Sequence, residues 1–583
     1  MTILGISLTH DGTLTVLRDG KNVFSMGEER LNRTKSYIGF PFQVLRYVVE
    51  HSIVAADEIS AVAISSGVFK KEWARSYAFE LTEDKKYYDI QNDKTPADFF
   101  LHDDEWQRVD SDAACKTYVE KKIRTILDAV GIHAPIEFYD HHRSHAASAY
   151  YTSGKDTALA ITLDGEGDLL SCTISECRDG KITTLASAPT SASIGYLYSE
   201  VTLRAGFKMS RHEGKITGLA AYGDPTKGWS IIKNEIEIRD GLFYFPRSTK
   251  LANILMRIRA KLGLARYAVN PWRSIIFMID HLSREDMAAT IQYALEIRTT
   301  ELVTYWTKKT GLRNVVTAGG VFANVKLNQK IAELPTVDSF FVFPDMGDGG
   351  NAYGASVLAH IDRGGAIARS RIEHVYLGPE YTNDEILDEL TQHPELIYQL
   401  SPDISKEAAA LVANKKIVGW FQGRMEYGPR ALGNRSVVAH PTDATINKWL
   451  NDRMKRTEFM PFAPSCLYEA ADEIFEIGKE SMKFPAEFMT ITFAMKKEWA
   501  AKAPAVAHVD GTARPQLVRA DVNPRYHALI SEYKNITGLP LLINTSFNVH
   551  EEPIVCHPRE AIASLKKGMV DVLALNDYLV TVK

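Results

Sequence analysis

The sequence predicts an α/β protein with two or three domains. A chain of 583 residues is too long for one hydrophobic core, and 45% hydrophobic with 24% charged residues is ordinary for a globular protein. A strand-rich pattern occurs twice, at residues 3–21 and 159–181, and an apolar run at 415–421 predicts a buried strand that leads into a glycine-rich loop. Strands that alternate with helical sequence in this way are typical of α/β folds.

The repeated pattern indicates the architecture of the first half. Residues 3–21 (ILGISLTHDGTLTVLRDGK) and 159–181 (LAITLDGEGDLLSCTISECRDGK) both end in RDGK, 160 positions apart. Each predicts a strand, a glycine-bearing turn with an acidic residue, a second strand and an Asp-Gly hairpin into a third strand. Two such units separated by helical sequence are what a duplicated actin-like ATPase core would show. The alternative is coincidence, because Asp-Gly hairpins are common.

A histidine-rich segment follows the first repeat, at residues 140–151 (DHHRSHAASAYY). Asp140 can cap a helix, and His141 and His145 then lie four residues apart on one face, which is the geometry of a metal clip. His142 is expected to point away from that face. The alternative is that the start of this helix is a polar surface.

Two aspartates complete a candidate metal site. Asp164 lies in the turn of the second repeat, and Asp348 lies in another glycine-rich turn, FPDMGDGGNAYGAS. Two imidazoles and two carboxylates suit Fe(II), Mn(II) or Zn(II), and the residues alone do not select among these ions. We expect Fe(II) first, with Mn(II), Zn(II) or Mg(II) as alternatives.

The most informative loop spans residues 423–436 (GRMEYGPRALGNRS) and follows the strand predicted at 415–421. It carries Arg424, Arg430 and Arg435 among glycines. Guanidinium groups match phosphate and carboxylate, and glycines let backbone N–H groups approach the same anion. The loop therefore predicts a phosphate-type site, with a structural turn as the alternative.

Two more glycine-rich segments, residues 213–225 (EGKITGLAAYGDP) and 317–328 (TAGGVFANVKLN), open helices whose first turns suit phosphate or ribose oxygens. Tight packing of helix on strand is the alternative. With the repeat turns, they give these expected nucleotide-binding residues: Asp11, Gly12, Gly165, Gly214, Lys215, Gly319, Gly320, Asn324 and Gly347.

Charge and cysteine content exclude several classes. A net charge of −5 gives no general attraction for polyanions, so we expect no nucleic acid partner. No apolar run is long enough to cross a bilayer, and the start MTILGISLTHDG lacks the features of a signal peptide, so we expect a cytoplasmic protein without a membrane partner. Five cysteines without a CxxC pair argue against a disulfide framework or a zinc ribbon, and predict reduced packing residues.

Taken together, these motifs resemble the NodU/CmcH family of O-carbamoyltransferases. The matching segments are GISLTHDG, HHRSHAASA, LDGEGD, EGKITGLAAYG, GGVFANVKLN, GRMEYGPRALGNRS, TEFMPFAPS, HVDGTARPQ and NTSFN. The resemblance implies a duplicated actin-like ATPase domain (ASKHA, TsaD-like) at residues 1–368 and a YrdC-like α/β domain at 369–583. Gly364-Gly365 and the turn-rich LGPEYTND agree with a boundary between residues 362 and 385.

The resemblance also implies a reaction. The YrdC-like domain takes carbamoyl phosphate and releases phosphate, and the carbamate reacts with ATP to give carbamoyl adenylate and pyrophosphate. The ATPase-like domain then passes the carbamoyl group to an acceptor hydroxyl and releases AMP. We expect the acceptor to be a small molecule, a secondary metabolite such as an antibiotic. A homodimer is compatible with the sequence, which carries no clear mark of oligomeric state.

Site residues follow from the family motifs. His10 is the implied base for the acceptor hydroxyl, with Arg430 and Lys455 as further catalytic residues, and His141, His145, Asp164 and Asp348 are the implied metal ligands. Carbamoyl phosphate or the adenylate is expected to bind Arg424, Arg430, Arg435, Arg456, Arg514, Asn544 and Ser546. Many relatives carry an arginine two positions after the lysine, where this chain has Thr457, which puts the roles of Lys455 and Arg456 in doubt. Surface salt bridges are the alternative for all these arginines.

Three rival functions stay open at this stage. One is threonylcarbamoyl adenylate chemistry for tRNA, against which the net charge and the TEFMPFAPS and HVDGTARPQ motifs weigh. Another is hydrogenase maturation, whose enzymes add an acylphosphatase domain and paired CxxC fingers. The third is a nucleotide-binding sensor without transfer activity. Residues 70–110 and 250–273 lie outside the motifs and are assigned no site.

Overall fold

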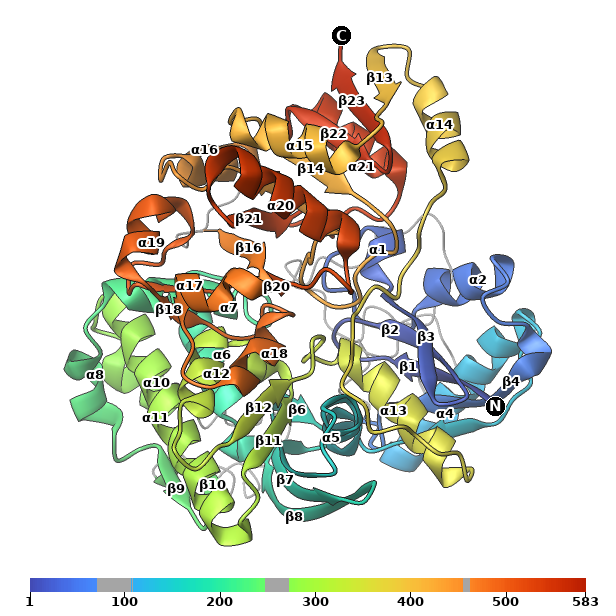
Figure 1. Cartoon of the computed structure of the whole chain (residues 1–583). Coiled ribbons are helices and arrows are strands. Elements are labelled where there is room, and N and C mark those ends of the chain that lie inside the picture. The colour runs from blue at the N-terminus through green and yellow to red at the C-terminus, as the bar shows by residue number, and fades with distance from the viewer. Residues whose placement is uncertain (71–105, 107, 247–271, 455–461) are drawn as a thin grey trace.

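The computed structural model of the chain describes residues 1–70, 106, 108–246, 272–454 and 462–583 (Figure 1). Lys455 and Arg456, both predicted site residues, lie outside the described residues, as does most of the segments 70–110 and 250–273. The described part contains two five-stranded sheets in the first half of the chain and an eight-stranded sheet in the second. The α/β class is therefore confirmed.

The two five-stranded sheets have the same strand order. The first is β3 (Lys21–Gly27), β2 (Thr13–Arg18), β1 (Thr2–Ser7), β4 (Ile59–Ile64) and β5 (Ile136–Phe138). The second is β8 (Lys181–Pro189), β7 (Leu170–Arg178), β6 (Thr157–Gly167), β11 (Asn314–Ala318) and β12 (Ser339–Val342). In each, three antiparallel strands are followed by two strands parallel to the first. This is the duplicated actin-like unit that the RDGK repeat predicts.

The Asp-Gly hairpins form as predicted. Asp19 and Gly20 have φ angles of 48° and 78°, and Asp179 and Gly180 have φ angles of 50° and 75°. Two consecutive residues with positive φ make a type I′ turn, whose twist matches that of the flanking strands. The identical tetrapeptide therefore builds an identical turn in both sheets.

Two helices are exchanged between the sheets. α5 (His141–Thr152) follows the first sheet but packs on β6 and β11, and α13 (Gly349–Asp362) follows the second sheet but packs on β1 and β2. The two helices also pack against each other, so closely that a Cβ on Gly354 would lie 1.9 Å from the carbonyl oxygen of Ser144. Only glycine fits there. The crossing brings the start of α5 next to the start of α13.

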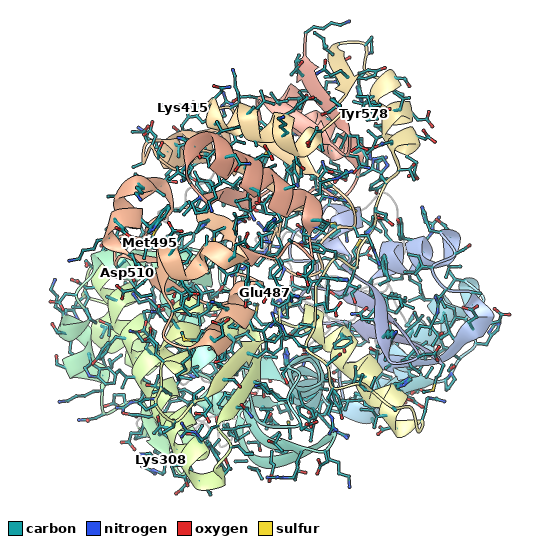
Figure 2. All side chains as sticks on the ribbon, in the orientation of Figure 1. Lys308, Lys415, Glu487, Met495, Asp510 and Tyr578 are labelled. Atoms are coloured by element: carbon teal, nitrogen blue, oxygen red, sulfur yellow. The ribbon has the colours of Figure 1, made fainter. Side chains whose placement is uncertain are left out.

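The remaining elements of the first half cover the second sheet and the edges of the first. The helices are α1 (Glu29–Asn32), α2 (Phe42–Glu50), η1 (Ala56–Glu58), α4 (Asp112–Ala129), η4 (Thr190–Ala192), α6 (Ile194–Arg204), α7 (Glu213–Leu219), η5 (Ala220–Tyr222), α8 (Pro225–Ile232), α10 (Arg273–Ile279), α11 (Arg284–Thr310), η6 (Gly320–Ala323) and α12 (Val325–Ala332). This half also contains an antiparallel hairpin of β9 (Glu237–Arg239) and β10 (Leu242–Tyr244). Lys308, in the last turn of α11, lies at the exposed periphery (Figure 2).

The eight-stranded sheet organises the second half. Its order is β13 (Leu396–Leu400), β23 (Tyr578–Val582), β22 (Val572–Leu575), β14 (Val418–Phe421), β15 (Arg435–Ala439), β21 (Leu541–Ser546), β16 (Ala463–Leu467) and β20 (Gln516–Val518). The buried strand predicted at 415–421 is β14, which begins three residues later because Lys415 has a φ of 61° and ends the preceding turn. Arg435 opens β15 and is thus part of a strand.

Helices and a small sheet complete this half. They are α14 (Asn383–Thr391), α15 (Ile404–Ala413), α16 (Ile446–Arg453), η7 (Tyr468–Ala470), α17 (Ala471–Ile474), η8 (Glu480–Met482), α18 (Lys483–Ala486), α19 (Lys497–Lys502), η9 (Pro504–Val506), α20 (Pro524–Thr537) and α21 (Pro558–Lys566), with β17 (Phe475–Glu476), β18 (Phe493–Met495) and β19 (Thr512–Ala513) as the small sheet. Among the described helices, none is long and apolar enough to cross a membrane. All five cysteines are buried and free, as predicted.

Buried polar contacts join the two halves. The Asn328 amide of α12 donates to the Thr490 carbonyl oxygen at 2.8 Å, and the Thr492 hydroxyl donates to Gln329 at 2.8 Å. These two contacts fix the second half against the first, so that one cavity can be lined by both. Within the second half, Glu487, in the middle of the molecule in Figure 2, pairs with Arg371 and, at 3.6 Å, with Arg519.

Candidate active site

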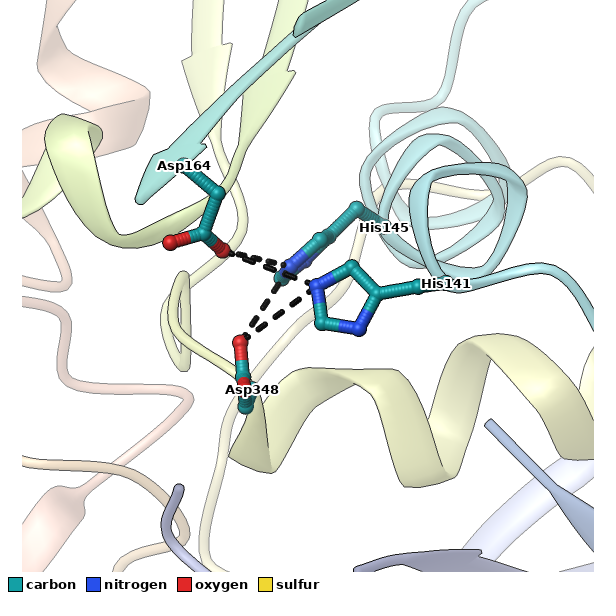
Figure 3. A group of neighbouring side chains, drawn as sticks. All are labelled: His141, His145, Asp164 and Asp348. Atoms are coloured by element: carbon teal, nitrogen blue, oxygen red, sulfur yellow. Dashed lines mark hydrogen bonds and ion pairs between the residues drawn. The ribbon is translucent and has the colours of Figure 1, made fainter. Parts of the chain in front are cut away.

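Four side chains from three elements converge on one point (Figure 3). His141 and His145 lie one turn apart on α5, whose N-terminus is capped by the Asp140 side chain, which accepts from the Arg143 N–H at 2.7 Å. Asp164 lies on β6, and Asp348 directly precedes α13. The exchanged helices thus bring together residues more than 200 positions apart, and the predicted cluster is confirmed as a group.

The spacing of the donor atoms fits a metal ion. Nε2 of His145 lies 3.1 Å from Asp164 Oδ2 and 3.6 Å from Asp348 Oδ1, and Nε2 of His141 lies 3.7 Å and 3.5 Å from the same two oxygens. An ion bonded at about 2.1 Å holds neighbouring ligands about 3.0 to 3.4 Å apart. Two buried imidazoles, the buried Asp348 carboxylate and the half-buried Asp164 carboxylate around one point therefore form a donor set suited to a divalent metal.

The protonation of the four side chains also favours a metal ion at this point. Burial alone would lower the pKa of His141, but attraction to Asp348 and the hydrogen bond with Asp164 raise it to about 9. Burial alone would raise the pKa of Asp164, yet the two histidines hold it well below its usual range. Two carboxylates close to one point favour a positive charge between them. A divalent cation brings more positive charge to that point than a single proton does.

Neighbouring side chains support this cluster. His142 points away, as expected, with Nδ1 2.7 Å from the Thr162 hydroxyl and Nε2 3.1 Å from the Leu170 carbonyl oxygen. The buried Asn351 amide lies 3.1 Å from Nε2 of His145. The sequence analysis missed Asn351, although its place on the helix one turn after Asp348 was a usable signal.

The cluster borders a cavity of about 660 Å³ that both halves of the chain line. This volume is within the range of small-molecule and cofactor sites. Predicted residues that line it are His10, Asp11, Gly12, Asp164, Gly165, Gly214, Lys215, Gly320, Asn324, Gly347, Asp348, Arg430, Arg514, Asn544 and Ser546. Residues separated by more than 500 positions in the sequence therefore share one chamber.

The first repeat turn faces this cavity beside the metal cluster. The Thr9 hydroxyl donates to Asp348 Oδ2 at 2.6 Å, and the next residue, His10, is exposed to the cavity. Asp11 has a φ of 58°, and burial, Glu29 and Asp348 raise its pKa to about 6 against the opposing effect of His10. Thr9 therefore ties the turn that presents His10 to a candidate metal ligand, a link the sequence did not reveal.

Only one of the three loop arginines lines the cavity. Arg424 donates to the carbonyl oxygens of Gly378, Val23 and Leu377 at 2.6 to 3.1 Å. The bond to Val23 fastens the loop to the first half of the chain, and Arg424 does not line the cavity. The prediction that it binds carbamoyl phosphate is corrected to a structural role.

Arg435 is the second correction. It is fully buried, its guanidinium lies 3.6 Å from the Phe421 ring centroid, and it donates to carbonyl oxygens of Gln422, Gly423 and Pro379. As the first residue of β15, its side chain lies under the loop and does not line the cavity. The predicted three-arginine anion site is thus reduced to Arg430 in this loop.

Arg430 lines the cavity together with residues from two other segments of the second half. Arg514, Asn544 and Ser546 line the same cavity. The Asn544 amide nitrogen lies 2.9 Å from Ser465 Oγ and 2.9 Å from Gln516 Oε1, which holds this side chain in place at the end of β21. The second half therefore contributes two guanidiniums and small polar groups to the chamber.

One predicted nucleotide-binding residue does not reach the cavity. Gly319 has a φ of 109°, and a Cβ there would lie 2.2 Å from the Leu163 carbonyl oxygen. It does not line the cavity, so close strand packing explains this glycine. The neighbouring Gly320 does line it, beside Asp164.

The cavity also contains residues that the sequence analysis did not single out. They are Glu29, Arg30, Lys35, Arg211, His212, Asp345, His508, His550 and Glu551. Burial and the charge of Asp11 raise the pKa of Asp345 to about 8. Asp345 and His508 lie inside motifs quoted in the sequence analysis, and Arg211, His212, His550 and Glu551 flank motifs by one to three positions, so that proximity was the available signal for them.

Comparisons with known proteins agree with this organisation. Residues 2–357 match the family described as "Carbamoyltransferase N-terminus", and residues 409–582 match "Carbamoyltransferase C-terminus". The chain is 30% identical to nodulation protein NolNO of Sinorhizobium fredii over 98% of this chain and 79% of that protein. It is 35% identical to nodulation protein NolO of Bradyrhizobium diazoefficiens, over 76% of this chain and 78% of that protein.

Solved structures resemble the chain only distantly. Component A of the (R)-2-hydroxyglutaryl-CoA dehydratase of Acidaminococcus fermentans has a TM-score of 0.34 at 13% identity, and the match covers 62% of this chain and 99% of that one. A ROK family glucokinase of Streptomyces griseus has a TM-score of 0.26 at 10% identity, over 61% and 99% of the two chains.

Proposed function

The chain belongs to the carbamoyltransferase family, and on this premise we propose that it uses ATP to transfer the carbamoyl group of carbamoyl phosphate to a hydroxyl of a small molecule. The observation that carries the proposal is the shared chamber. Asp164 and Asp348 of the candidate metal cluster line it from the first half of the chain, and Arg430 and Arg514 line it from the second half. A metal for nucleotide phosphates and guanidiniums for the donor phosphate thus border one volume.

The proposed reaction has two chemical stages. Water hydrolyses carbamoyl phosphate to carbamate and phosphate, and an oxygen of the carbamate then attacks the α-phosphorus of ATP, whose bond to the β-phosphate oxygen breaks, to give carbamoyl adenylate and pyrophosphate. The acceptor oxygen then attacks the carbamoyl carbon, and the bond to AMP breaks. In this scheme residues 1–368 hold the nucleotide and the acceptor, and residues 369–583 hold carbamoyl phosphate.

The second half supplies anion recognition. Arg430 and Arg514 present donors suited to a phosphate or carbamate oxygen, and Asn544 and Ser546 add polar groups at the end of β21. The glycines at 428 and 433 have φ angles of 106° and 98°, which bend the loop so that Arg430 lines the cavity while Arg435 stays beneath it.

The first half supplies the transfer site. His10 is exposed to the cavity, and an imidazole there can accept the proton of an acceptor hydroxyl at neutral pH. Thr9 fixes this turn to Asp348, one of the four residues that would hold the metal. A bound divalent ion would act as a Lewis acid toward phosphate oxygens and neutralise charge on the leaving AMP. The nucleotide would then have its phosphates beside His10.

The acceptor is proposed to be a small molecule of the secondary-metabolite class. The chamber of about 660 Å³ is of the size that small ligands and cofactors occupy. The net charge of −5 gives the chain no general attraction for a polyanionic acceptor such as tRNA.

Product analysis tests the donor chemistry. The purified protein is incubated with ATP, carbamoyl phosphate and Fe(II) or Mn(II), and carbamoyl adenylate, AMP and pyrophosphate are followed by mass spectrometry. We expect these products from this mixture, and none from a parallel mixture of ATP, threonine and bicarbonate. Threonylcarbamoyl adenylate from the second mixture would overturn the proposal.

Two variants localise the chemistry. Arg430→Ala should lose carbamoyl phosphate-dependent AMP formation, because the guanidinium that lines the chamber is removed. Arg178→Ala, at an exposed position on β7, serves as the matched control and should retain it. Unchanged turnover in Arg430→Ala would remove the second half of the chain from the mechanism.

A further inference from the structure

A second group of ionisable side chains lies on the cavity wall, apart from the metal cluster. Its centre is Glu551, in the loop between β21 and α21. Four basic side chains approach its carboxylate: Lys208 Nζ at 3.0 Å, Arg211 Nη1 at 3.8 Å, His212 Nε2 at 3.0 Å and His550 Nε2 at 3.5 Å. Because three of the four come from the segment before α7, the group joins the two halves of the chain across the cavity.

Two histidines and a glutamate this close could hold a metal, but the hydrogen bonds argue against it. The Lys208 backbone N–H donates to Nδ1 of His212 at 3.2 Å, so Nε2 carries the proton and donates to Glu551. A metal would need the lone pair at that nitrogen. The positive charges of Lys208 and Arg211 on the same carboxylate would also repel a cation.

The backbone at Glu551 is strained. Its φ is 64°, in the left-handed region that glycine adopts readily and other residues seldom do. Such a conformation is disfavoured for a residue with a Cβ atom and persists only when surrounding contacts hold it. Here the ion pairs with Lys208 and His212 are those contacts. A strained residue whose side chain enters a basic cluster on a cavity wall suggests a functional reason for the strain.

We propose that Lys208, Arg211, His212 and His550 form a binding site for a phosphate-type anion, which the Glu551 carboxylate occupies in this structure and leaves when the anion binds. Arg211, His212 and His550 line the cavity, so an anion within it can reach their donors. The Glu551 carboxylate lies where a phosphate group would accept the same hydrogen bonds.

Charge and exposure make the exchange feasible. With Glu551 in place, Lys208 and Arg211 share one negative charge, and a dianion in its place would neutralise both. The Glu551 side chain is 33% exposed, so it can turn outward into solvent without burying its charge elsewhere.

The class of ligand rests on the proposed function, which releases both orthophosphate and pyrophosphate into this chamber. Pyrophosphate carries more charge and more oxygens than orthophosphate, and four donors spread around a carboxylate suit the larger anion. We therefore assign the site to pyrophosphate or a nucleotide polyphosphate tail, with orthophosphate as the alternative source of the same chemistry.

Isothermal titration calorimetry with inorganic pyrophosphate and, separately, orthophosphate tests the site. Full-length protein is titrated without ATP or carbamoyl phosphate, so the result does not depend on turnover. Glu551→Gln should bind pyrophosphate about tenfold more tightly than the wild type, because the competing carboxylate is gone. Glu551→Gly should show at least the same gain, and a φ of 64° suits glycine, so this variant should fold as well as the wild type. A larger gain for orthophosphate would support the site and reassign its ligand.

Two controls make the result specific. Glu552→Gln makes the same charge change at the next residue of the loop, which also lines the cavity but is not the partner in these four ion pairs, and it should gain much less affinity than Glu551→Gln. Lys208→Met combined with Glu551→Gln should abolish the gain, because one cation of the cluster is removed. Equal affinities in all variants, an equal gain in Glu552→Gln, or a gain that survives loss of Lys208 would each overturn the proposal. A protein that binds pyrophosphate as predicted but makes no carbamoyl adenylate would refute the function alone.

Discussion

The two walls of the cavity, one from each half of the chain, obtain their charged groups in different ways. On the first wall, His141, Asp164 and Asp348 come from three separate elements, and all of them point to one centre. On the second wall, the three arginines at 424, 430 and 435 lie within twelve residues, yet only the middle one lines the cavity. The three arginines are neighbours in the sequence but do not form one site. The residues of the metal cluster are distant in the sequence, and the exchanged helices bring them together.

The difference has a physical cause. A loop rich in glycine has few side chains to pack, so something else must satisfy its backbone carbonyl groups. Arg435 does so by donating to the carbonyl oxygens of Gln422 and Gly423, while Arg424 fastens the loop to carbonyl oxygens outside it. The metal cluster needs no such support, because its members stand on the ends of a strand and two helices that are already fixed by packing.

The largest effect should come from removing the buried loop arginine. Arg435→Met leaves the carbonyl oxygens of Gln422, Gly423 and Pro379 without their donor, and should lower the free energy of unfolding by about 3–5 kcal/mol. Arg430→Met should lower it by about 1 kcal/mol or less. Urea unfolding followed by circular dichroism measures both. Similar losses in the two variants would contradict the division of roles on this wall.

The second effect concerns the metal wall. Asp164→Asn removes a charged donor and should weaken Mn(II) or Fe(II) binding by ~100-fold, with little change in unfolding free energy. Calorimetric titration of the metal and elemental analysis of the purified protein measure this. Asp156→Asn, at an exposed position just before β6, is the matched control and should bind as the wild type does. Full metal content in Asp164→Asn would exclude this residue as a ligand.

A third test uses pH. Glu28 accepts the backbone N–H groups of Gln43 and Val44 at 3.1 Å and 3.0 Å, and its burial raises its pKa from 4.5 to about 8 despite these bonds. The fold therefore favours the protonated form, and stability present below pH 4.5 is lost as pH rises toward 8. Between about pH 5.5 and 7.5 this amounts to roughly 2–3 kcal/mol.

Glu28→Gln isolates that contribution, because glutamine keeps the shape of the side chain and cannot ionise. Its urea midpoint should fall less steeply with pH than that of the wild type across the same interval. Because Glu28 lies in the first half of the chain, next to the cavity-lining Glu29, the test also asks whether that half holds buried carboxyl groups outside the metal cluster. Parallel pH profiles for the two proteins would rule out Glu28 as the titrating group.

The smallest effect should come from the link between the His10 turn and the metal cluster. Thr9→Val removes the hydrogen bond to Asp348 and should reduce carbamoyl transfer about fivefold, equivalent to about 1 kcal/mol. Thr9→Ser keeps the hydroxyl and should retain most of the activity. Rates of AMP formation with saturating donor measure both. Equal rates in the valine and serine variants would show that transfer does not depend on the hydrogen bond between residue 9 and Asp348.

The sequence determined what depends on neighbours along the chain. The RDGK repeats predicted two Asp-Gly hairpins and the doubled sheet, and the Asp140 cap predicted a helix with His141 and His145 on one face. Backbone dihedral preferences, caps and residue spacing act over a few positions, so they can be read without knowing the fold.

Only the tertiary structure decided which charged groups lie together and which are buried. It placed Arg435 under the loop, Gly319 against β6, and Thr9 beside Asp348, and it gathered four basic side chains around Glu551. Each of these outcomes depends on how segments tens to hundreds of residues apart pack, and the burial of a guanidinium or a carboxylate is settled by its partners there. Residue type and spacing specify the chemistry a side chain can perform, and packing specifies whether that side chain reaches the substrate.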